Sequence, residues 1–168
     1  MSIEAESIRL LAEEYMYLQQ TIEKFDARAL QIKEWGTGIS IAIIAFALKL
    51  PNRWLVCLAA VNALCFWVIE ATWKLFQWSY MGRIWEIEKH FRTVYQDHEL
   101  PPLQITQYWL SQWRGGELLE EFNWKRDKVE VYFEKLFDWN VMLPYLLIVI
   151  LVGFIYMFWN RFGFKQAD

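Results

Sequence analysis

The sequence lacks the motifs by which many enzymes are recognised. It holds no phosphate-binding glycine loop, no serine elbow and no cysteine cluster. Its two histidines, His90 and His98, lie about 12 Å apart along a helix, which is too far for them to share one metal ion directly. We therefore expect a protein that is not an enzyme and that uses no cofactor and no metal.

Cysteine is also scarce. The two cysteines, Cys57 and Cys65, lie in one apolar run, about 12 Å apart along a helix, so they cannot form a disulfide with each other there. We expect both to behave as small buried apolar groups. The first 34 residues are polar, so we expect no cleavable signal peptide, and Ser2 does not fit the Met-Gly start of a myristoylation site. A net charge of −3 gives no reason to expect a nucleic-acid partner.

Apolar residues, by contrast, are abundant. Hydrophobic residues make up 56% of the chain and charged residues 22%, a mixture that suggests membrane spans plus a soluble helical part. Residues 139–159 carry no charge and have tryptophan, which favours the membrane interface, at both ends. About 20 apolar residues of helix cross a bilayer core of about 30 Å. A buried core helix is the competing interpretation, but 168 residues rarely build a core that encloses such a helix.

Two further apolar runs predict a membrane hairpin. Residues 35–50 and 54–73 are joined by a turn at 51–53. The first run is short for a crossing, and the side chain of Lys49 can extend toward the interface to lengthen it. The chain therefore has three expected transmembrane helices.

Two polar residues of the second run need partners. Asn62 lies near its centre, where an amide costs free energy unless it bonds to a neighbouring helix or to water in a lumen. Glu70 lies near the interface, one turn before Lys74, where an ion pair along the helix would ease its burial. A solvated or paired interfacial residue is the favoured interpretation of Glu70.

Small residues four apart occur twice on the first run, where they let another helix approach closely. The pairs are Gly36 with Ser40 and Gly38 with Ala42. Their use for helix packing within one subunit is the simpler interpretation. Together with Asn62, they also support assembly into a homo-oligomer. If that assembly encloses a pore, Thr37, Ser40 and Asn62 are the candidates for lining it.

A heptad stripe precedes the first span. Apolar residues recur at spacings of three and four without a glycine or proline, which predicts a helix that packs against another helix. The stripe consists of Ile8, Leu11, Tyr15, Leu18, Ile22, Phe25, Ala29 and Ile32. A helix lying on lipid is the alternative, but its outer face would usually be basic, and this face is acidic. A second stripe should pair with the first in antiparallel fashion: Tyr80, Ile84, Ile87, Phe91 and Val94.

The rest of the chain is expected to be helical. Pro101 and Pro102 end the second long helix, residues 103–114 form a short amphipathic helix, and residues 117–138 run directly into the third span. The fold class is therefore an all-α integral membrane protein with helical extensions that form a cytoplasmic bundle. The expected parts are a heptad helix (1–34), spans at 35–50, 54–73 and 139–159, a cytoplasmic helical region (74–138) and a tail (160–168).

The short helix carries an aromatic cluster: Tyr108, Trp109, Trp113 and the adjacent Arg114. These residue types dominate the hot spots of protein interfaces, so they are candidates for binding a cytoplasmic protein partner. Two alternatives are an aromatic anchor on the bilayer surface and rings that cap the helical bundle.

Residues 80–89 read YMGRIWEIEK, in which an aromatic residue, an arginine and a hydrophobic–acidic pair follow the membrane hairpin. In this layout the chain, over about residues 1–100, resembles the SLATT group of two-span effectors in antiviral conflict systems. It is also similar to RipA-type small octameric membrane proteins of bacteria. The resemblance implies a pore-forming or membrane-disrupting effector that a partner sensor triggers. Arg83 and Glu86 are candidates for an ionic lock between helices, although their spacing also fits a pair within one helix.

The distribution of Lys and Arg predicts the orientation. Most of them lie in residues 1–34 and 74–138, and only four lie on the other side: Lys49, Arg53, Arg161 and Lys165. The positive-inside rule favours a cytoplasmic N-terminus, and we expect the bacterial inner membrane. The leading hypothesis is an oligomeric pore or channel-like assembly controlled by its cytoplasmic bundle, which the resemblance would make a bacterial defence effector. The alternative is a membrane scaffold that recruits a soluble partner.

Overall fold

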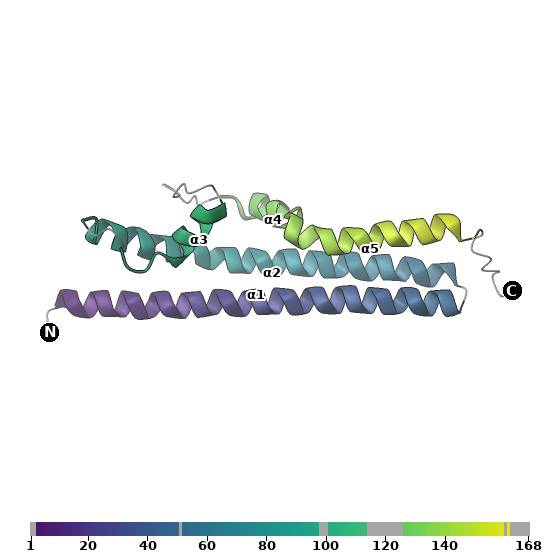
Figure 1. Ribbon diagram of the computed structural model, residues 1–168, viewed down its shortest axis with the longest axis horizontal. Helices are drawn as coiled ribbons and strands as arrows, with labels where there is room; N and C mark the ends of the chain where they lie inside the picture. The colour runs from purple at the N-terminus through teal and green to yellow at the C-terminus, as the bar shows by residue number, and fades with distance from the viewer. Residues whose placement is uncertain (1–2, 51, 98–100, 114–125, 160, 162–168) are drawn as a thin grey trace. The chain divides into compact units, whose positions relative to one another are not determined.

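The described part of the chain consists of α-helices and holds no strand, which confirms the all-helical fold class (Figure 1). The computed structural model describes residues 3–50, 52–97, 101–113, 126–159 and 161. The helices are α1 (Ile3–Lys49), α2 (Arg53–Val94), α3 (Ile105–Trp113), α4 (Lys128–Leu136) and α5 (Trp139–Phe158). Two of them, α2 and α5, are long and apolar enough to cross a membrane, judged by length and composition.

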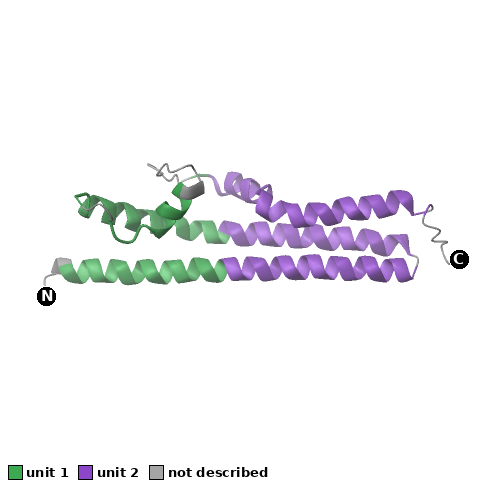
Figure 2. Ribbon diagram, in the orientation of Figure 1, with its two compact units in different colours: residues 1–25, 76–126 green, residues 26–75, 127–168 purple. Residues whose placement is uncertain are grey.

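The helices form two compact units, to both of which α1 and α2 contribute (Figure 2). Unit 1 comprises residues 1–25 and 76–126, and unit 2 comprises residues 26–75 and 127–168. Because α1 and α2 each continue without a break, the boundaries expected at residues 34 and 74 fall inside helices.

The core of unit 1 forms where the two apolar stripes meet. Tyr15 and Leu18 of α1 are buried together with three residues of α2, Ile84, Ile87 and Phe91. Other members of the N-terminal stripe, such as Ile8, Leu11 and Ile22, are partly buried against this cluster. The predicted pairing is thus confirmed, and the heptad helix packs within its own chain.

The turn into α3 requires an unusual backbone conformation. Leu103, directly after the two prolines, has a φ of 56°, a left-handed value that costs a non-glycine residue about 1–2 kcal/mol. Its side chain packs against the core of unit 1, and this burial offsets the strain. The turn thereby brings the N-terminus of α3 against α1 and α2.

The core of unit 2 is built from three helices. Ala47 of α1 and Val56 of α2 are fully buried in one cluster with Tyr145, Ile148 and Trp159 of the α5 region. Three further small or β-branched residues of α1 and α2 complete the two-helix face of this cluster. Because Trp159 reaches the end of the hairpin, α5 runs parallel to α1 and antiparallel to α2.

The third apolar helix does not continue from the helix before it, contrary to the expectation that residues 117–138 run directly into it. The helix α4 ends at Leu136, and α5 begins at Trp139 after an N-cap residue, Asp138, whose carboxylate accepts a hydrogen bond from Asn140 N at 2.9 Å. An N-cap side chain satisfies an amide that the helix itself cannot bond, so the chain breaks and restarts here. The part of that prediction that covers residues 117–125 lies outside the described residues.

The two small-residue pairs of α1 have different surroundings. A Cβ on Gly36 would lie 2.6 Å from Phe66 Cβ and 3.0 Å from Tyr145 Cε1, so this glycine allows α1, α2 and α5 to approach closely. A Cβ on Gly38 would meet nothing within 4 Å. The Gly36–Ser40 pair therefore serves packing within the subunit, whereas Gly38 is exposed.

This contrast generates a matched test. We expect Gly36→Ala to destabilise unit 2 by about 1–3 kcal/mol, because overpacking a close contact forces the helices apart. Gly38→Ala is the control and should stabilise the protein slightly, because alanine favours a helix over glycine by about 1 kcal/mol. Thermal unfolding of the two variants in one detergent checks this, and equal melting temperatures would contradict the packing.

Candidate functional site

The residues expected to line a pore are instead bonded within the chain. The Asn62 side chain donates to Ser40 Oγ at 2.9 Å and to Gly36 O at 3.2 Å, and Ser40 Oγ donates to Ala59 O at 3.2 Å. Ser40 is fully buried, and Thr37 donates its hydroxyl to Lys33 O at 2.7 Å. The bonds of Asn62 and Ser40 join α1 to α2 in the middle of the apolar region, whereas the bond of Thr37 lies within α1. A pore-lining role for Thr37, Ser40 and Asn62 stays a prediction.

Unit 2 also buries a polar junction that joins three helices. The carboxylate of Glu70 on α2, only 1% exposed, accepts a hydrogen bond from Tyr145 Oη of α5 at 2.8 Å. Lys33 Nζ of α1 lies 3.1 Å from the same carboxylate. Lys74, the expected partner of Glu70, forms its ion pair with Asp26 at 2.7 Å instead. The expected pairing was wrong because the nearest cation comes from another helix.

A proline explains why Lys33 reaches the start of α5. Pro144 lies inside α5 and has no N–H to donate to the carbonyl four residues earlier, that of Asn140. Lys33 Nζ donates to this carbonyl at 2.6 Å and so satisfies it. In the same unit, Trp67 Nε1 donates at 2.7 Å to Leu136 O, a carbonyl at the end of α4. Side chains of the hairpin thus complete the hydrogen bonding of α4 and α5.

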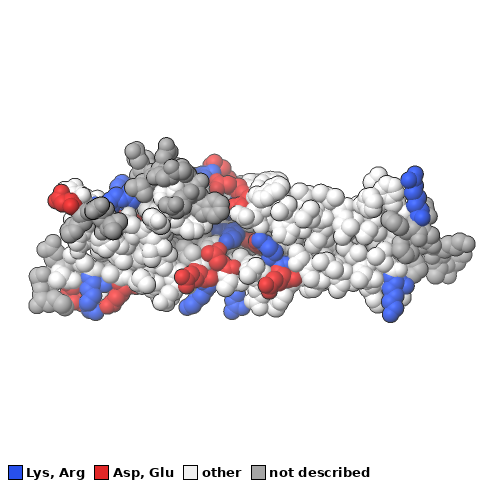
Figure 3. All heavy atoms as spheres, viewed as in Figure 1, with Lys and Arg blue, Asp and Glu red and all other residues white. Residues whose placement is uncertain are grey.

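The outer surface of unit 2 is apolar. Large hydrophobic side chains are exposed on all three of its long helices, and Figure 3 shows a stretch of surface without charged groups. They include Trp35, Ile39, Ile41, Phe46, Trp54, Leu58, Val61, Leu64, Val68, Leu147, Ile150, Phe154 and Met157. Water would disfavour so large an apolar surface, whereas lipid would cover it without cost.

In unit 1 a buried carboxylate fixes α3. Glu88 of α2 accepts hydrogen bonds from Thr106 N at 2.8 Å and from Gln107 N at 3.0 Å, two amides of the first turn of α3. Its oxygen Oε1 also accepts from Tyr15 Oη at 2.7 Å, and this hydroxyl accepts in turn from Ile105 N at 2.9 Å. Glu88 thus caps α3 from a neighbouring helix, where a negative charge also complements the helix dipole.

Burial and hydrogen bonding act on Glu88 in opposite directions. Burial disfavours the charged carboxylate and raises its pKa above the ordinary value, while the donors from Tyr15, Thr106 and Gln107 stabilise the charge. Burial also raises the pKa of the Tyr15 phenol, as does its bond to Glu88, so that phenol stays a neutral donor.

The aromatic cluster lies on the outer face of α3. Ile105, Tyr108 and Trp109 are 53%, 68% and 58% exposed, and they line one open hollow with Gln104. Gln107 and Ser111 of the same helix face inward and are buried. The rings of Tyr108 and Trp109 therefore do not cap the bundle, and the surface interpretations fit them better. The side chain of Trp113, and all of Arg114, lie outside the described residues.

The expected ionic lock includes a residue that sequence analysis missed. Arg83 of α2 donates to both carboxylate oxygens of Glu14 on α1, at 2.7 and 2.9 Å, and contacts Glu86 of its own helix at 3.3 Å. The interhelical partner is thus Glu14, whose pKa Arg83 lowers. Because both side chains are well exposed, the pair contributes at most about 1 kcal/mol.

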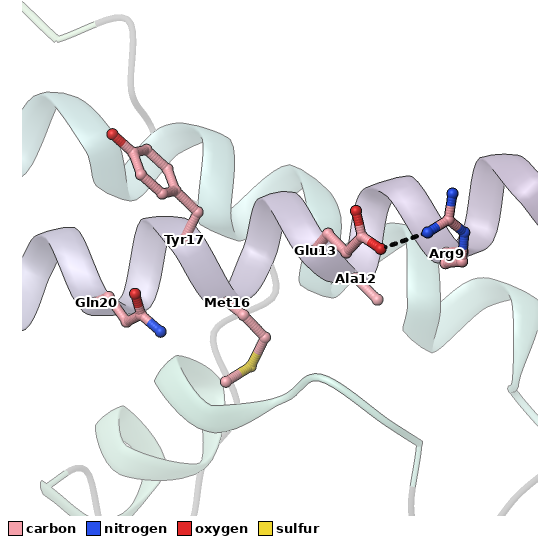
Figure 4. A pocket seen from close by; sticks show the side chains of 6 residues that line it. All are labelled: Arg9, Ala12, Glu13, Met16, Tyr17 and Gln20. Carbon is pink, nitrogen blue, oxygen red and sulfur yellow. Dashed lines mark hydrogen bonds and ion pairs between the residues drawn. The ribbon is translucent and has the colours of Figure 1, made fainter.

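A second open hollow lies on α1, on the side away from Tyr15. Six residues from Arg9 to Gln20 line it, all from one helix, and Arg9 is ion-paired with Glu13 at 2.7 Å (Figure 4). Met16 and Tyr17 are exposed there. Because its walls come from a single helix, this hollow is too open to enclose a ligand.

Comparisons with family models, with curated proteins and with solved structures found no match to this chain. Within the described residues, no group of three or more His, Cys, Asp and Glu side chains is placed to hold a metal ion. The arrangement is therefore one of structural junctions and exposed faces. The outer face of α3, with Tyr108 and Trp109, and the apolar surface of unit 2 are the two features that support a function.

The Glu88 junction generates a prediction with a matched control. Tyr15→Phe removes one donor from Glu88 and leaves Ile105 N without its partner, which should cost about 1–3 kcal/mol. Amide hydrogen exchange across α3 should then become roughly tenfold faster. Tyr17→Phe, at an exposed phenol on the same helix, should leave the exchange of α3 unchanged.

Tyr15→Phe should also change the pH dependence of the hydrogen-exchange protection of α3. A carboxyl whose pKa is raised in the folded state contributes stability below its unfolded pKa and loses it as pH rises through the folded value. Because Tyr15 lowers the pKa of Glu88, Tyr15→Phe raises it further. Protection of α3, relative to the wild type at each pH, should therefore fall as the pH rises above the ordinary titration range of a carboxyl group. A ratio of variant to wild-type protection that does not change with pH would contradict this role for Glu88.

Proposed function

We propose that unit 2 is a membrane anchor with three transmembrane helices, at 35–50, 54–73 and 139–159. The apolar side chains exposed on all three helices support this, because a bilayer is the environment in which such a surface is stable. The bonds of Asn62 and Ser40 support it too, since they satisfy polar groups that lipid cannot. By its Lys and Arg distribution the anchor has a cytoplasmic N-terminus in the bacterial inner membrane.

On this anchor, we propose, the protein is a scaffold that recruits a soluble protein through the outer face of α3. The observation that carries the proposal is the combination of exposure and rigidity. Tyr108 and Trp109 are exposed on a nine-residue helix that Tyr15 and Glu88 hold in place from two other helices. A helix this short is not stable alone. Fixing it in advance lowers the entropy cost of binding, and Trp and Tyr are the residues that most often anchor a partner.

The anchor is further proposed to be a homo-oligomer. Gly38 and Ala42 form an exposed small-residue pair on α1, whereas the neighbouring pair is used within the subunit. Such pairs support close contact between helices in lipid. Several copies would present several α3 faces, which raises the avidity for a partner that is itself multivalent.

A photo-crosslinking amino acid tests the scaffold. Placed at Trp109 in living cells, it should capture one discrete protein, and the additional change Tyr108→Ala should lower the yield at least fivefold, as for a binding hot spot. The same probe at Tyr17, an exposed position on α1 of the same unit, should not capture that protein. Capture of lipid at Trp109 would contradict the scaffold and favour an aromatic anchor on the bilayer.

The second candidate is an oligomeric pore, and the position of Asn62 near the centre of its span favours it. The Asn62 side chain is partly exposed, and only its nitrogen is used in the bonds to Gly36 and Ser40. The carboxamide oxygen is therefore available to face a lumen that several copies enclose. The resemblance to two-span effectors would make such an assembly a bacterial defence effector under the control of its cytoplasmic part.

Ion flux in liposomes distinguishes the two candidates. A pore predicts that Asn62→Leu lowers flux at least tenfold, because a polar lining group is lost. Cys65→Leu, an exposed site one turn away, is the control and should not change it. Wild-type protein that assembles but conducts no ions would remove the pore and leave the scaffold.

A further inference from the structure

Among the described residues, the end of unit 2 that holds the hairpin turn carries positive charge and no Asp or Glu. Lys49 ends α1, Arg53 begins α2, and Arg161 follows α5. In the sequence no Asp or Glu lies in residues 35–69 or 139–167, and the acidic C-terminal residue, Asp168, lies outside the described residues. Among the described residues, no ion pair involves these three cations. Figure 3 shows Lys and Arg at this end with no acidic group beside them.

The three cations belong to one end of the unit because the helices that carry them meet there. Asn52 N donates to Ala47 O at 3.1 Å, which closes the turn between Lys49 and Arg53. Trp159 lies in the same buried cluster as Ala47 and Val56, so the end of α5 reaches the turn. Arg161 N donates to Phe158 O at 2.9 Å, which keeps this cation next to the last turn of α5.

The N-terminus of α2 adds to the positive potential. Its cap is neutral, since Trp54 N donates to the amide oxygen of Asn52 at 3.0 Å, and its first turn contains no acidic residue. The positive end of the helix dipole therefore adds to the charge of the cations at this end, and no described acidic residue of the first turn offsets it. In addition, Arg53 Nε is buried and has no hydrogen-bond partner among the described residues. A buried guanidinium N–H without a partner costs free energy.

Cations at the other end of unit 2 have partners within the chain. Lys33 is paired with Glu70 at 3.1 Å, and Lys74 is paired with Asp26 at 2.7 Å. The chain thus supplies its own anions at one end and none at the other. This difference points to an external anion at the turn.

We infer that Lys49, Arg53 and Arg161 interact with the phosphates of anionic phospholipid headgroups at this end of unit 2. The inference rests on the proposed membrane anchor, because it needs this end of unit 2 to lie at a bilayer surface. Two of the cations lie over aromatic rings, Arg53 over Trp54 at 5.5 Å and Arg161 over Phe158 at 5.4 Å. Such cation–ring pairs suit the headgroup region, where the ring lies against the acyl chains and the cation faces phosphate.

Lipid binding to the full-length protein tests the site. Phosphatidylglycerol and phosphatidylcholine are titrated separately into the detergent-solubilised protein, and the bound lipid is counted by native mass spectrometry. The wild type should bind phosphatidylglycerol at least tenfold more tightly. Each of Lys49→Gln, Arg53→Gln and Arg161→Gln should weaken this preference about fivefold, because one cation near a charged surface contributes about 1 kcal/mol.

A charge-matched triple variant is the control. Lys24→Gln, Arg28→Gln and Lys89→Gln remove three exposed cations elsewhere on the chain and should keep the full preference. The variant to compare combines Lys49→Gln, Arg53→Gln and Arg161→Gln. The inference is overturned if this variant keeps the preference for phosphatidylglycerol or if the control triple variant loses it. It is also overturned if the wild type shows no such preference. Displacement of phosphatidylglycerol by millimolar inorganic phosphate would also overturn it, by assigning the site to a free anion.

Flotation with phosphatidylcholine vesicles separates this inference from the membrane proposal. If the protein does not float, the membrane anchor itself fails. If the wild type and the turn variants float equally while only the variants lose the lipid preference, both proposals hold. Equal flotation without any lipid preference refutes the headgroup site alone.

Discussion

Each unit depends on a carboxylate that α2 buries against other helices. In unit 2 Glu70 receives Lys33 from α1 and Tyr145 from α5, and in unit 1 Glu88 receives Tyr15 from α1 and two amides of α3. A charged group out of water is expensive, and it is tolerated only where donors surround it. The cost makes each carboxylate selective, because a misplaced helix would leave a buried charge without a partner.

The two carboxylates share a chemical solution. Each accepts a hydrogen bond from a tyrosine hydroxyl on another helix, at 2.7 Å for Glu88 and 2.8 Å for Glu70. A tyrosine combines a large apolar ring, which fills the space between helices, with a hydroxyl at its far end. Tyr15 and Tyr145 are both fully buried, so each contributes to packing and to charge solvation at once. The rest of each core is then free to be apolar.

Periodicity was enough to predict the long-range packing but not these junctions. The spacing of three and four identified the faces of α1 and α2 that meet, down to Tyr15 and Ile84, because burial of a stripe repeats along a helix. A single buried charge, by contrast, leaves no periodic pattern in the sequence from which its partner could be predicted. Glu70 was assigned to Lys74, its neighbour in sequence, whereas its partner Lys33 comes from a helix that only the folded hairpin brings near. The cap at Asp138 carried a local signal in the sequence, an aspartate directly before an apolar helix.

The proline of α5 has a consequence for the order of assembly. Because Pro144 leaves Asn140 O without a partner in its own helix, the first turns of α5 are complete only when Lys33 is beside them. Lys33 and Glu70 belong to the hairpin, which can close by itself through its turn and the bonds of Asn62. The helix α5 therefore completes its hydrogen bonding only after it packs against the hairpin. The side chain that completes it, Lys33, is synthesised more than a hundred residues before Asn140.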